Sequence, residues 1–232
     1  MIVLLLGCSS KSPTNLYKSW DVSEQSYEIT IEYQGSFRSN GSVQADLFQR
    51  VDVDAQCKGQ PTDSPKQKLT CNVTVDPVFS GIVEIDVKEN QIKNLILPPD
   101  SQNMYDVVAT AIGSILPPAV PANCETSQSY KVKKPQEYMR IPFLNGPSSH
   151  LHTYEVIQCE PPKLSMTGKF TISAQGTENQ SAPRFTFGTT DQVELDTDGY
   201  IQNREYKQSL IISTTSLAPN SVYQNIYVKK RK

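Results

Sequence analysis

The fold is decided by the stretch Tyr27-Glu28-Ile29-Thr30-Ile31-Glu32-Tyr33, in which apolar and polar side chains alternate residue by residue. A period of two places the apolar side chains on one face of a β-strand. The same alternation predicts further strands within 43–57, 69–75, 79–87, 95–97, 130–132, 139–143, 150–159, 164–174, 185–187, 193–195, 210–212 and 222–228. The chain is therefore predicted to be all-β and antiparallel, with a dozen or so short strands.

One segment departs from this period and predicts a helix over residues 101–116. Its apolar side chains recur at helical spacing, and Asp100 or Ser101 can cap its start while Pro117-Pro118 ends it. The stripe consists of Met104, Val107, Val108, Ala111, Ile112, Ile115 and Leu116. The opposite side of the helix carries little charge, so we expect the helix to be enclosed on more than one side. We predict a closed or nearly closed β-barrel wrapped around this central helix, because closure removes exposed strand edges.

The N-terminus carries an apolar run that ends at Gly7-Cys8, as the tail of a secretion signal does. Leu5-Leu6-Gly7-Cys8 resembles the lipobox of bacterial lipoproteins, which implies that Cys8 receives lipid. The serines that follow resemble an outer-membrane address. The resemblance divides the chain into a signal remnant (1–7), a lipidated cysteine with its tether (8–20) and one β-barrel domain (21–232). The run is short and lacks a basic region, which leaves open a start further upstream; the alternative is an ordinary buried cysteine.

Composition and cysteine content limit the remaining possibilities. The 232 residues suit one large β domain or two small ones, and the net charge of −2 offers no general attraction to nucleic acid. Apart from Cys8 there are four cysteines, and an even number in an exported chain favours two disulfides with three possible pairings. No C-x-x-C spacing occurs, which argues against zinc. Cys57 and Cys71 share the apolar parity of neighbouring predicted strands.

The order of these parts resembles the N-terminal β-barrel module of large lipid transfer proteins, the vitellogenin and microsomal triglyceride transfer protein family. The residues that carry the likeness are 27–35, the long strand with Cys57, the hairpin 79–97 and the helix 103–116 directly after it. The resemblance implies a barrel around one helix, and Cys124 and Cys159 fall where the family has a later cysteine pair. We therefore expect the disulfides Cys57–Cys71 and Cys124–Cys159. The family continues into a helical solenoid and lipid-cavity sheets, so the resemblance carries over the barrel and not lipid transfer itself.

Few residues suggest chemistry. His150 and His152 point the same way on a strand and could share a metal, but no third ligand is evident, and solvated strand histidines explain them as well. A second candidate is an acidic cluster around a turn, which could hold calcium or could simply be hairpin-tip aspartates; it comprises Asp191, Glu194, Asp196 and Asp198. The basic tail 229–232 could contact anionic headgroups or be a solvated chain end. We predict no catalytic residue, no metal and no cofactor.

Two classes of function remain. The first is a membrane-anchored envelope lipoprotein that acts as a lipid-binding or lipid-transport-related β-barrel module, with the helix stripe either facing lipid or forming core. The second is a structural or protein-interaction lipoprotein of the outer membrane with no ligand. In both, the partner is the membrane, reached through the lipid anchor, with lipid or an envelope protein as a further partner, and the protein is not an enzyme.

Overall fold

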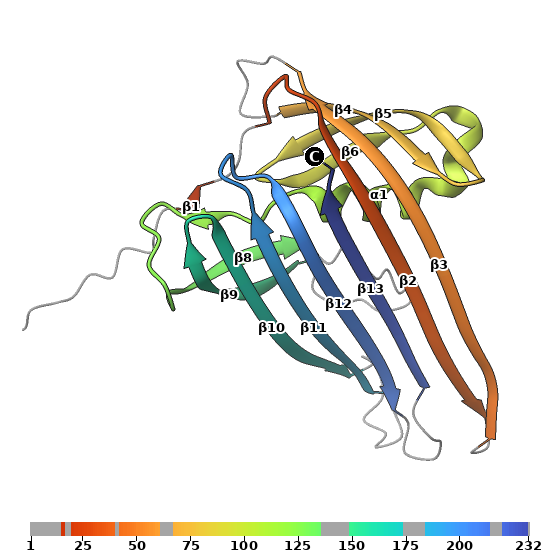
Figure 1. Cartoon of the computed structure of the whole chain (residues 1–232). Helices are drawn as coiled ribbons and strands as arrows, with labels where there is room; N and C mark the ends of the chain where they lie inside the picture. The colour runs from red at the N-terminus through yellow and green to blue at the C-terminus, as the bar shows by residue number, and fades with distance from the viewer. Residues whose placement is uncertain are drawn as a thin grey trace, which may run out of the picture.

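The computed structural model describes residues 15–16, 20–39, 42–60, 67–135, 149–173, 184–213 and 220–231. Within them, strands account for most of the chain, and one helical segment separates the first strands from the rest (Figure 1). The first part contains β1 (Asn15–Leu16), β2 (Gln25–Ser39), β3 (Ser42–Gly59), β4 (Gln67–Val75), β5 (Phe79–Lys88) and β6 (Gln91–Ile96). The helical segment is η1 (Pro99–Met104) and α1 (Tyr105–Ile115). The second part contains β7 (Val120–Pro121), β8 (Ser129–Pro135), β9 (Ser149–Cys159), β10 (Pro162–Ser173), β11 (Arg184–Leu195), β12 (Ile201–Ser213) and β13 (Asn220–Lys230).

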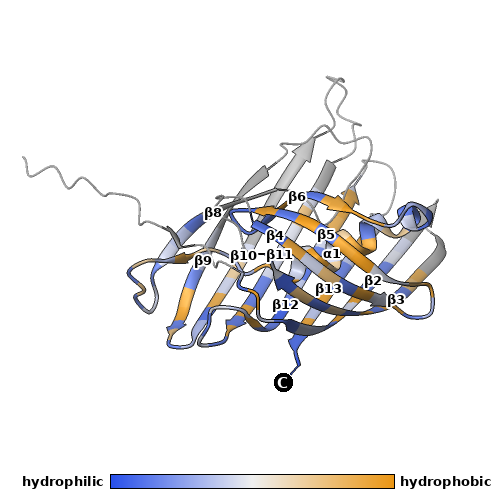
Figure 2. Cartoon of the chain, turned by 90° about the horizontal axis from the view of Figure 1, so that it is seen from above, coloured by the Kyte–Doolittle hydropathy of each residue, from blue (hydrophilic) through white to orange (hydrophobic). Residues whose placement is uncertain are grey.

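Eleven of the strands form one antiparallel sheet in the order β6-β5-β4-β3-β2-β13-β12-β11-β10-β9-β8. Two meanders, β2 to β6 and β8 to β13, meet where the last strand β13 pairs with β2, and β1 and β7 form a separate pair. The alternation of hydropathy along these strands is visible in Figure 2. The all-β, antiparallel prediction is therefore confirmed.

Of the predicted closed or nearly closed barrel, closure is not found, because hydrogen bonds do not join the two ends of the sheet in the described part of the chain. Among the described strands, β6 and β8 stand at the two ends of the strand order and do not pair with each other. Proline lies at the end of both edge strands: Pro98 and Pro99 come one residue after β6, and Pro135 is the last residue of β8. Proline has no N–H to donate to a ladder, so these residues limit how far each edge strand can continue along its own length.

Strand β3 is the long strand predicted over 43–57, whereas β2 is longer than the short strand predicted. Strand β2 has 15 residues and β3 has 18, and their pairing continues without a loop through positions where the sequence pattern weakens. In Figure 1 the long strands β2, β3, β12 and β13 run well past α1. The sheet is therefore divided lengthwise into a half that faces the helix and a half that extends beyond it.

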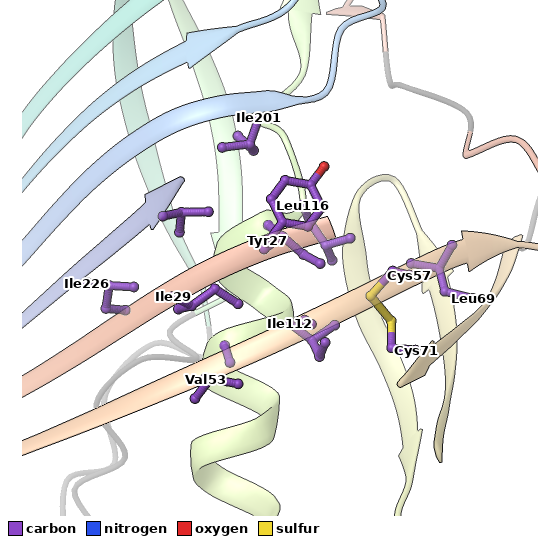
Figure 3. Packing of buried hydrophobic residues seen from close by; sticks show 14 of the residues in the cluster. Tyr27, Ile29, Val53, Cys57, Leu69, Cys71, Ile112, Leu116, Ile201 and Ile226 are labelled. Carbon is purple, nitrogen blue, oxygen red and sulfur yellow. A yellow bond between two sulfur atoms is a disulfide. The ribbon is translucent and has the colours of Figure 1, made fainter. Parts of the chain in front are cut away.

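The core lies between the sheet and α1. Figure 3 shows Ile112 and Leu116 of the helix among side chains of the first strands, including Tyr27, Ile29 and Val53. Beside them Cys57 bonds Cys71, and these cysteines are direct cross-strand partners in the β3–β4 ladder. The second disulfide joins Cys124 to Cys159. These are the two predicted pairs, the first expected from the shared parity of neighbouring strands and the second from the family resemblance.

The predicted helix is present but begins differently. Residues 99–104 form a 3₁₀ segment, and α1 proper covers Tyr105–Ile115. Neither Asp100 nor Ser101 caps α1, whose first flanking residue is Met104 with no side-chain capping bond. Proline at the start of the 3₁₀ segment favours this tighter turn because its fixed φ suits a first helical position. Among the described residues no helix combines the length and the apolar character needed to cross a bilayer.

Several predictions lie outside the described residues. They are the lipidated Cys8, the signal remnant 1–7, most of the tether 8–20 and the strand 139–143. The division into domains stays a prediction.

Candidate functional site

The concave side of the sheet, which we call the inner face, is organised in rows that cross the strands. Because every ladder is antiparallel and in register, one side chain from each strand contributes to each row. Beside the helix lie apolar rows. Further along the strands comes a polar row, formed by Gln49, Tyr33, Gln224, Gln208 and Thr189. Next is a distal row, formed by Leu47, Gly35, Val222, Leu210 and Phe187.

A buried ion pair interrupts the apolar rows beside the helix. Arg204 on β12 bonds Asp191 on β11 through two parallel contacts, Nε to Oδ1 at 2.8 Å and Nη2 to Oδ2 at 2.6 Å. The exposed fractions of the two side chains are 1% and 0%. The Tyr154 hydroxyl from β9 donates to Asp191 Oδ2 at 2.5 Å. Paired geometry of this kind is what allows two charges to be held away from water.

Arg204 also connects the end of α1 to the sheet through hydrogen bonds. Its Nη1 donates to the carbonyl oxygen of Ser114 at 2.9 Å and to that of Leu116 at 3.4 Å. The last carbonyls of a helix have no partner within the helix and carry partial negative charge, so a cation at this end satisfies both needs. Burial raises the pKa of Tyr154 well above its usual value, and the neighbouring Asp191 charge raises it further. The cluster is therefore a structural connection between β9, β11, β12 and the end of α1.

The polar row contains amides that are buried without partners. Gln224 is 1% exposed and Gln208 is 5% exposed, and they face each other across β13 and β12. Among the described residues, neither amide atom of Gln224 makes a hydrogen bond, and neither does the Gln208 Oε1. The Tyr33 hydroxyl lies nearby: burial raises its pKa, and close contacts with the Gln224 and Thr110 side chains lower it in part. The Gln224 contact favours the charged tyrosine but does not have the geometry of an ordinary hydrogen bond, so the amide atoms still lack a partner within the described part of the chain. Buried amide atoms without partners are costly, so this row requires an explanation, as do the unpartnered Trp20 Nε1 and the Tyr27 and Tyr130 hydroxyls elsewhere in the described core.

Exposure rises across the inner face towards β3. In the polar row Thr189 and Gln208 are buried, Tyr33 is half-buried and Gln49 is exposed. In the distal row Phe187 and Leu210 are buried, Val222 is half-buried, Gly35 is buried and Leu47, at the β3 end, is 59% exposed. An apolar surface thus continues from the core to solvent at the β3 side.

The helix stripe belongs to the core. Val108, Ala111, Ile112 and Ile115 have no exposed area, and Leu116 has 4%. The other two members of the predicted stripe, Met104 and Val107, are half-buried and pack against the same cluster. The structure therefore supports the interpretation that the stripe forms part of the core, and not the alternative that it faces lipid.

The predicted acidic cluster does not come together. Asp191 lies inside with Arg204, whereas Glu194 points outward, bonds Lys163 at 2.9 Å and has a lowered pKa because of that lysine. Asp196 accepts hydrogen bonds within its own turn and from Lys230. The remaining member, Asp198, is exposed. These carboxylates therefore have separate structural roles.

Two further sequence candidates have mixed outcomes. The side chains of His150 and His152 fall outside the described part of the structure, although β9 includes both residues. In the basic tail, Lys230 pairs with Asp196 at 2.6 Å. Arg231 pairs with Glu28 and Asp54 at 2.9 and 2.6 Å. These two charges of the tail hold β13 to the rest of the sheet.

The outer face carries a small hollow over β4, β5 and β6. Its volume is about 50 Å³ and its lining includes Lys68, Glu84, Asp86 and Asn94. This space admits a few water molecules and is too polar and too small for an acyl chain.

Comparison with known proteins finds likeness in fold and not in sequence. No family model and no curated protein sequence matches the chain. Among solved structures, the chain is similar to lipovitellin in a study of lipid–protein interactions, with a TM-score of 0.50 and 9% sequence identity. The match covers 91% of this chain and 25% of the lipovitellin chain, so this chain spans about a quarter of that protein. The fold is thus vitellogenin-like, as the order of elements in the sequence suggested.

Sequence reasoning missed the ion pair and the amide pair. A signal was available, because Asp191, Arg204, Gln208 and Gln224 all occupy the apolar parity of their strands. A polar residue at an inward position requires a partner or a purpose. Only the register of β11, β12 and β13 shows that these residues lie side by side.

Proposed function

We propose that the protein is a lipid-binding β-sheet module that is tethered to a membrane of the cell envelope through a lipidated Cys8. The observation that carries the proposal is the fold shared with lipovitellin, whose solved structure concerns lipid–protein interactions. Transport of lipid is part of the same proposal, and catalysis is not.

The distal row supplies the surface for lipid. It is apolar along its described length, lies beyond the helix and reaches solvent at Leu47. An acyl chain laid on this row would remove the exposed area of Leu47 and Val222 from water, at about 25 cal/mol per Å². The helix half of the inner face is already filled by side chains and offers no comparable surface.

A matched pair of variants on β13 tests this surface. Val222 faces inward in the distal row, and its neighbour Tyr223 faces outward with 39% exposure. V222N should reduce binding of a fluorescent fatty-acyl probe several-fold, whereas Y223N should leave binding unchanged. Lipid extraction of the purified protein followed by mass spectrometry gives an independent readout. Equal effects of the two variants would contradict the assignment of lipid to the inner face.

The anchor is tested separately. Two or more acyl chains on one cysteine hold a protein stably at a bilayer, whereas a single chain does not. C8A should therefore move the protein from the membrane fraction to the soluble fraction. Unchanged fractionation would remove the anchor and the envelope location from the proposal.

The second candidate is a structural or protein-interaction lipoprotein with no ligand. The observation in its favour is the filled helix half of the inner face, where the largest side chains have no exposed area. Purified C8S protein that contains no extractable lipid and binds no acyl probe would support this candidate against the first.

A further inference from the structure

We propose that the polar row recognises the head of an uncharged monoacylglycerol, with its acyl chain lying along the distal row. This inference rests on the proposed lipid-binding function and specifies the lipid class. The motivating observation is that three buried amide atoms on adjacent strands have no partner among the described residues: Gln208 Oε1, Gln224 Oε1 and Gln224 Nε2.

The atoms define the complementary ligand. Two amide oxygens are acceptors and require two donors, and one amide nitrogen is a donor and requires an acceptor. A monoacylglycerol carries two hydroxyl groups and one ester carbonyl, which supplies this set. A triacylglycerol carries acceptors only, and so does an ionised fatty acid.

The charges on the inner face distinguish further between an uncharged lipid head and an ionised fatty acid. Among the described residues, the polar row, the distal row and the row beside Ile31 and Ile226 contain no lysine or arginine. On the same face of β12, the cation next along the strand is Arg204, which already pairs with Asp191. A carboxylate head would therefore be buried without a counter-charge, at considerable cost. An uncharged head avoids that cost.

The geometry of the face suits a head and a chain together. The distal row follows the polar row two residues along each strand, roughly 7 Å away. Exposure increases in both rows towards Gln49 and Leu47 on β3, and this is the side from which the ligand would enter. Gln208 and Leu210, in the buried parts of the two rows, then contact the innermost part of the lipid.

The test compares three ligands of equal chain length. The full chain carrying C8S is titrated by calorimetry with 1-decanoyl-glycerol, methyl decanoate and decanoate, each below its aggregation concentration. We expect 1-decanoyl-glycerol to bind most tightly. Each hydrogen bond contributes a factor of roughly 2 to 10, so Q208L should weaken its binding by about that factor and Q224L by about 5- to 100-fold.

Controls distinguish recognition from a structural effect. Gln56 lies exposed on the outer face of β3, and Q56L should change no affinity. Methyl decanoate has the ester carbonyl but no hydroxyl group, so Q224L should weaken its binding by at most the roughly 2- to 10-fold of one hydrogen bond, less than it weakens 1-decanoyl-glycerol. Q224L should also melt no lower than the unchanged protein, because it removes buried polar atoms that have no partner.

The outcomes separate this inference from the function on which it rests. Equal affinity for all three ligands would overturn the head-group assignment while leaving lipid binding in place. A fall in the melting temperature of both Q224L and Q208L would also overturn it, because the amides would then be part of the internal packing. Absence of binding by every ligand would instead count against the proposed function itself.

Discussion

Replacing Arg204 by methionine removes the centre of the buried cluster. The substitution keeps an unbranched side chain and deletes the guanidinium, which makes two contacts to Asp191 and two to the carbonyl oxygens of Ser114 and Leu116. The Asp191 carboxylate, with 0% exposure, then loses its counter-charge. The end of α1 loses its connection to β12 at the same time.

The expected cost is large. Breaking a buried pair by removing one partner costs about 3–5 kcal/mol, because a charge is left in a dry environment. In a chain of this length, 1 kcal/mol lowers the melting temperature by about 2–4 °C. R204M should therefore lower the melting temperature by about 6–20 °C. The double variant D191L/R204M leaves no buried charge and should be less destabilised than R204M, by an amount limited by the lost bonds to the helix.

Urea unfolding followed by tryptophan fluorescence provides the measurement. The single tryptophan, Trp20, is 4% exposed and stacks edge-on against Tyr200 at 5.1 Å, so its emission reports the packed state. The matched control is R50M, because Arg50 and Asp52 form an ion pair on the surface with 54% and 60% exposure. Exposed pairs of this kind contribute little, and R50M should unfold as the unchanged protein does.

Two results would refute this reasoning. One is an R204M variant whose stability is close to that of R50M, which would mean that water reaches Asp191. The other is a double variant at least as unstable as R204M, which would mean that the bonds to the helix, and not the buried charge, dominate. Both comparisons are made between urea unfolding curves measured in the same way for each variant.

Three other predictions concern the core and its ionisable groups. I112D places a carboxylate where the structure leaves no exposed area and should cost several kcal/mol or prevent folding; a melting curve shifted by less than a few degrees would contradict a core role for the helix. C57S/C71S opens a loop of 14 residues and should lower the free energy of unfolding by about 3 kcal/mol, measured in urea without reductant. Burial raises the pKa of Tyr27 and of Tyr130, with neighbouring aspartates adding to the rise. A buried tyrosine with a raised pKa resists ionisation in the folded state, whereas in the unfolded state it ionises at about pH 10. The free energy of unfolding is therefore unaffected by these tyrosines below about pH 10 and falls as the pH rises above that value. Phenolate absorbance should accordingly show a late group of tyrosines that ionise only as the fold opens, and simultaneous ionisation of all tyrosines at ordinary pH would count against their burial.

Much of the local structure could be predicted from the pattern of the chain. Alternation at Tyr27, Ile29 and Ile31 depends on neighbours in sequence, and so does the helical spacing that ends at Pro117. The hairpin turn at Asp196 to Gly199 was predictable for the same reason, since Gly199 has the positive φ of 81° that such turns use. Strand parity also predicted the Cys57–Cys71 disulfide, and the order of elements carried the family likeness and, through it, the Cys124–Cys159 disulfide.

Long-range pairing decided the rest. Whether β6 and β8 meet depends on how far the whole sheet curls, a sum over every strand that no single segment reveals, and the sheet stays open. Asp191 was assigned from the sequence to an acidic cluster and Arg204 to no site, and only the register of β11 and β12 shows that the two residues, 13 apart in sequence, are in contact at the end of α1. The facing amides Gln208 and Gln224 emerge only from the pairing of β12 with β13. A strand pattern determines which face a residue occupies, because side chains alternate along one chain, but only the register between chains determines what it faces there.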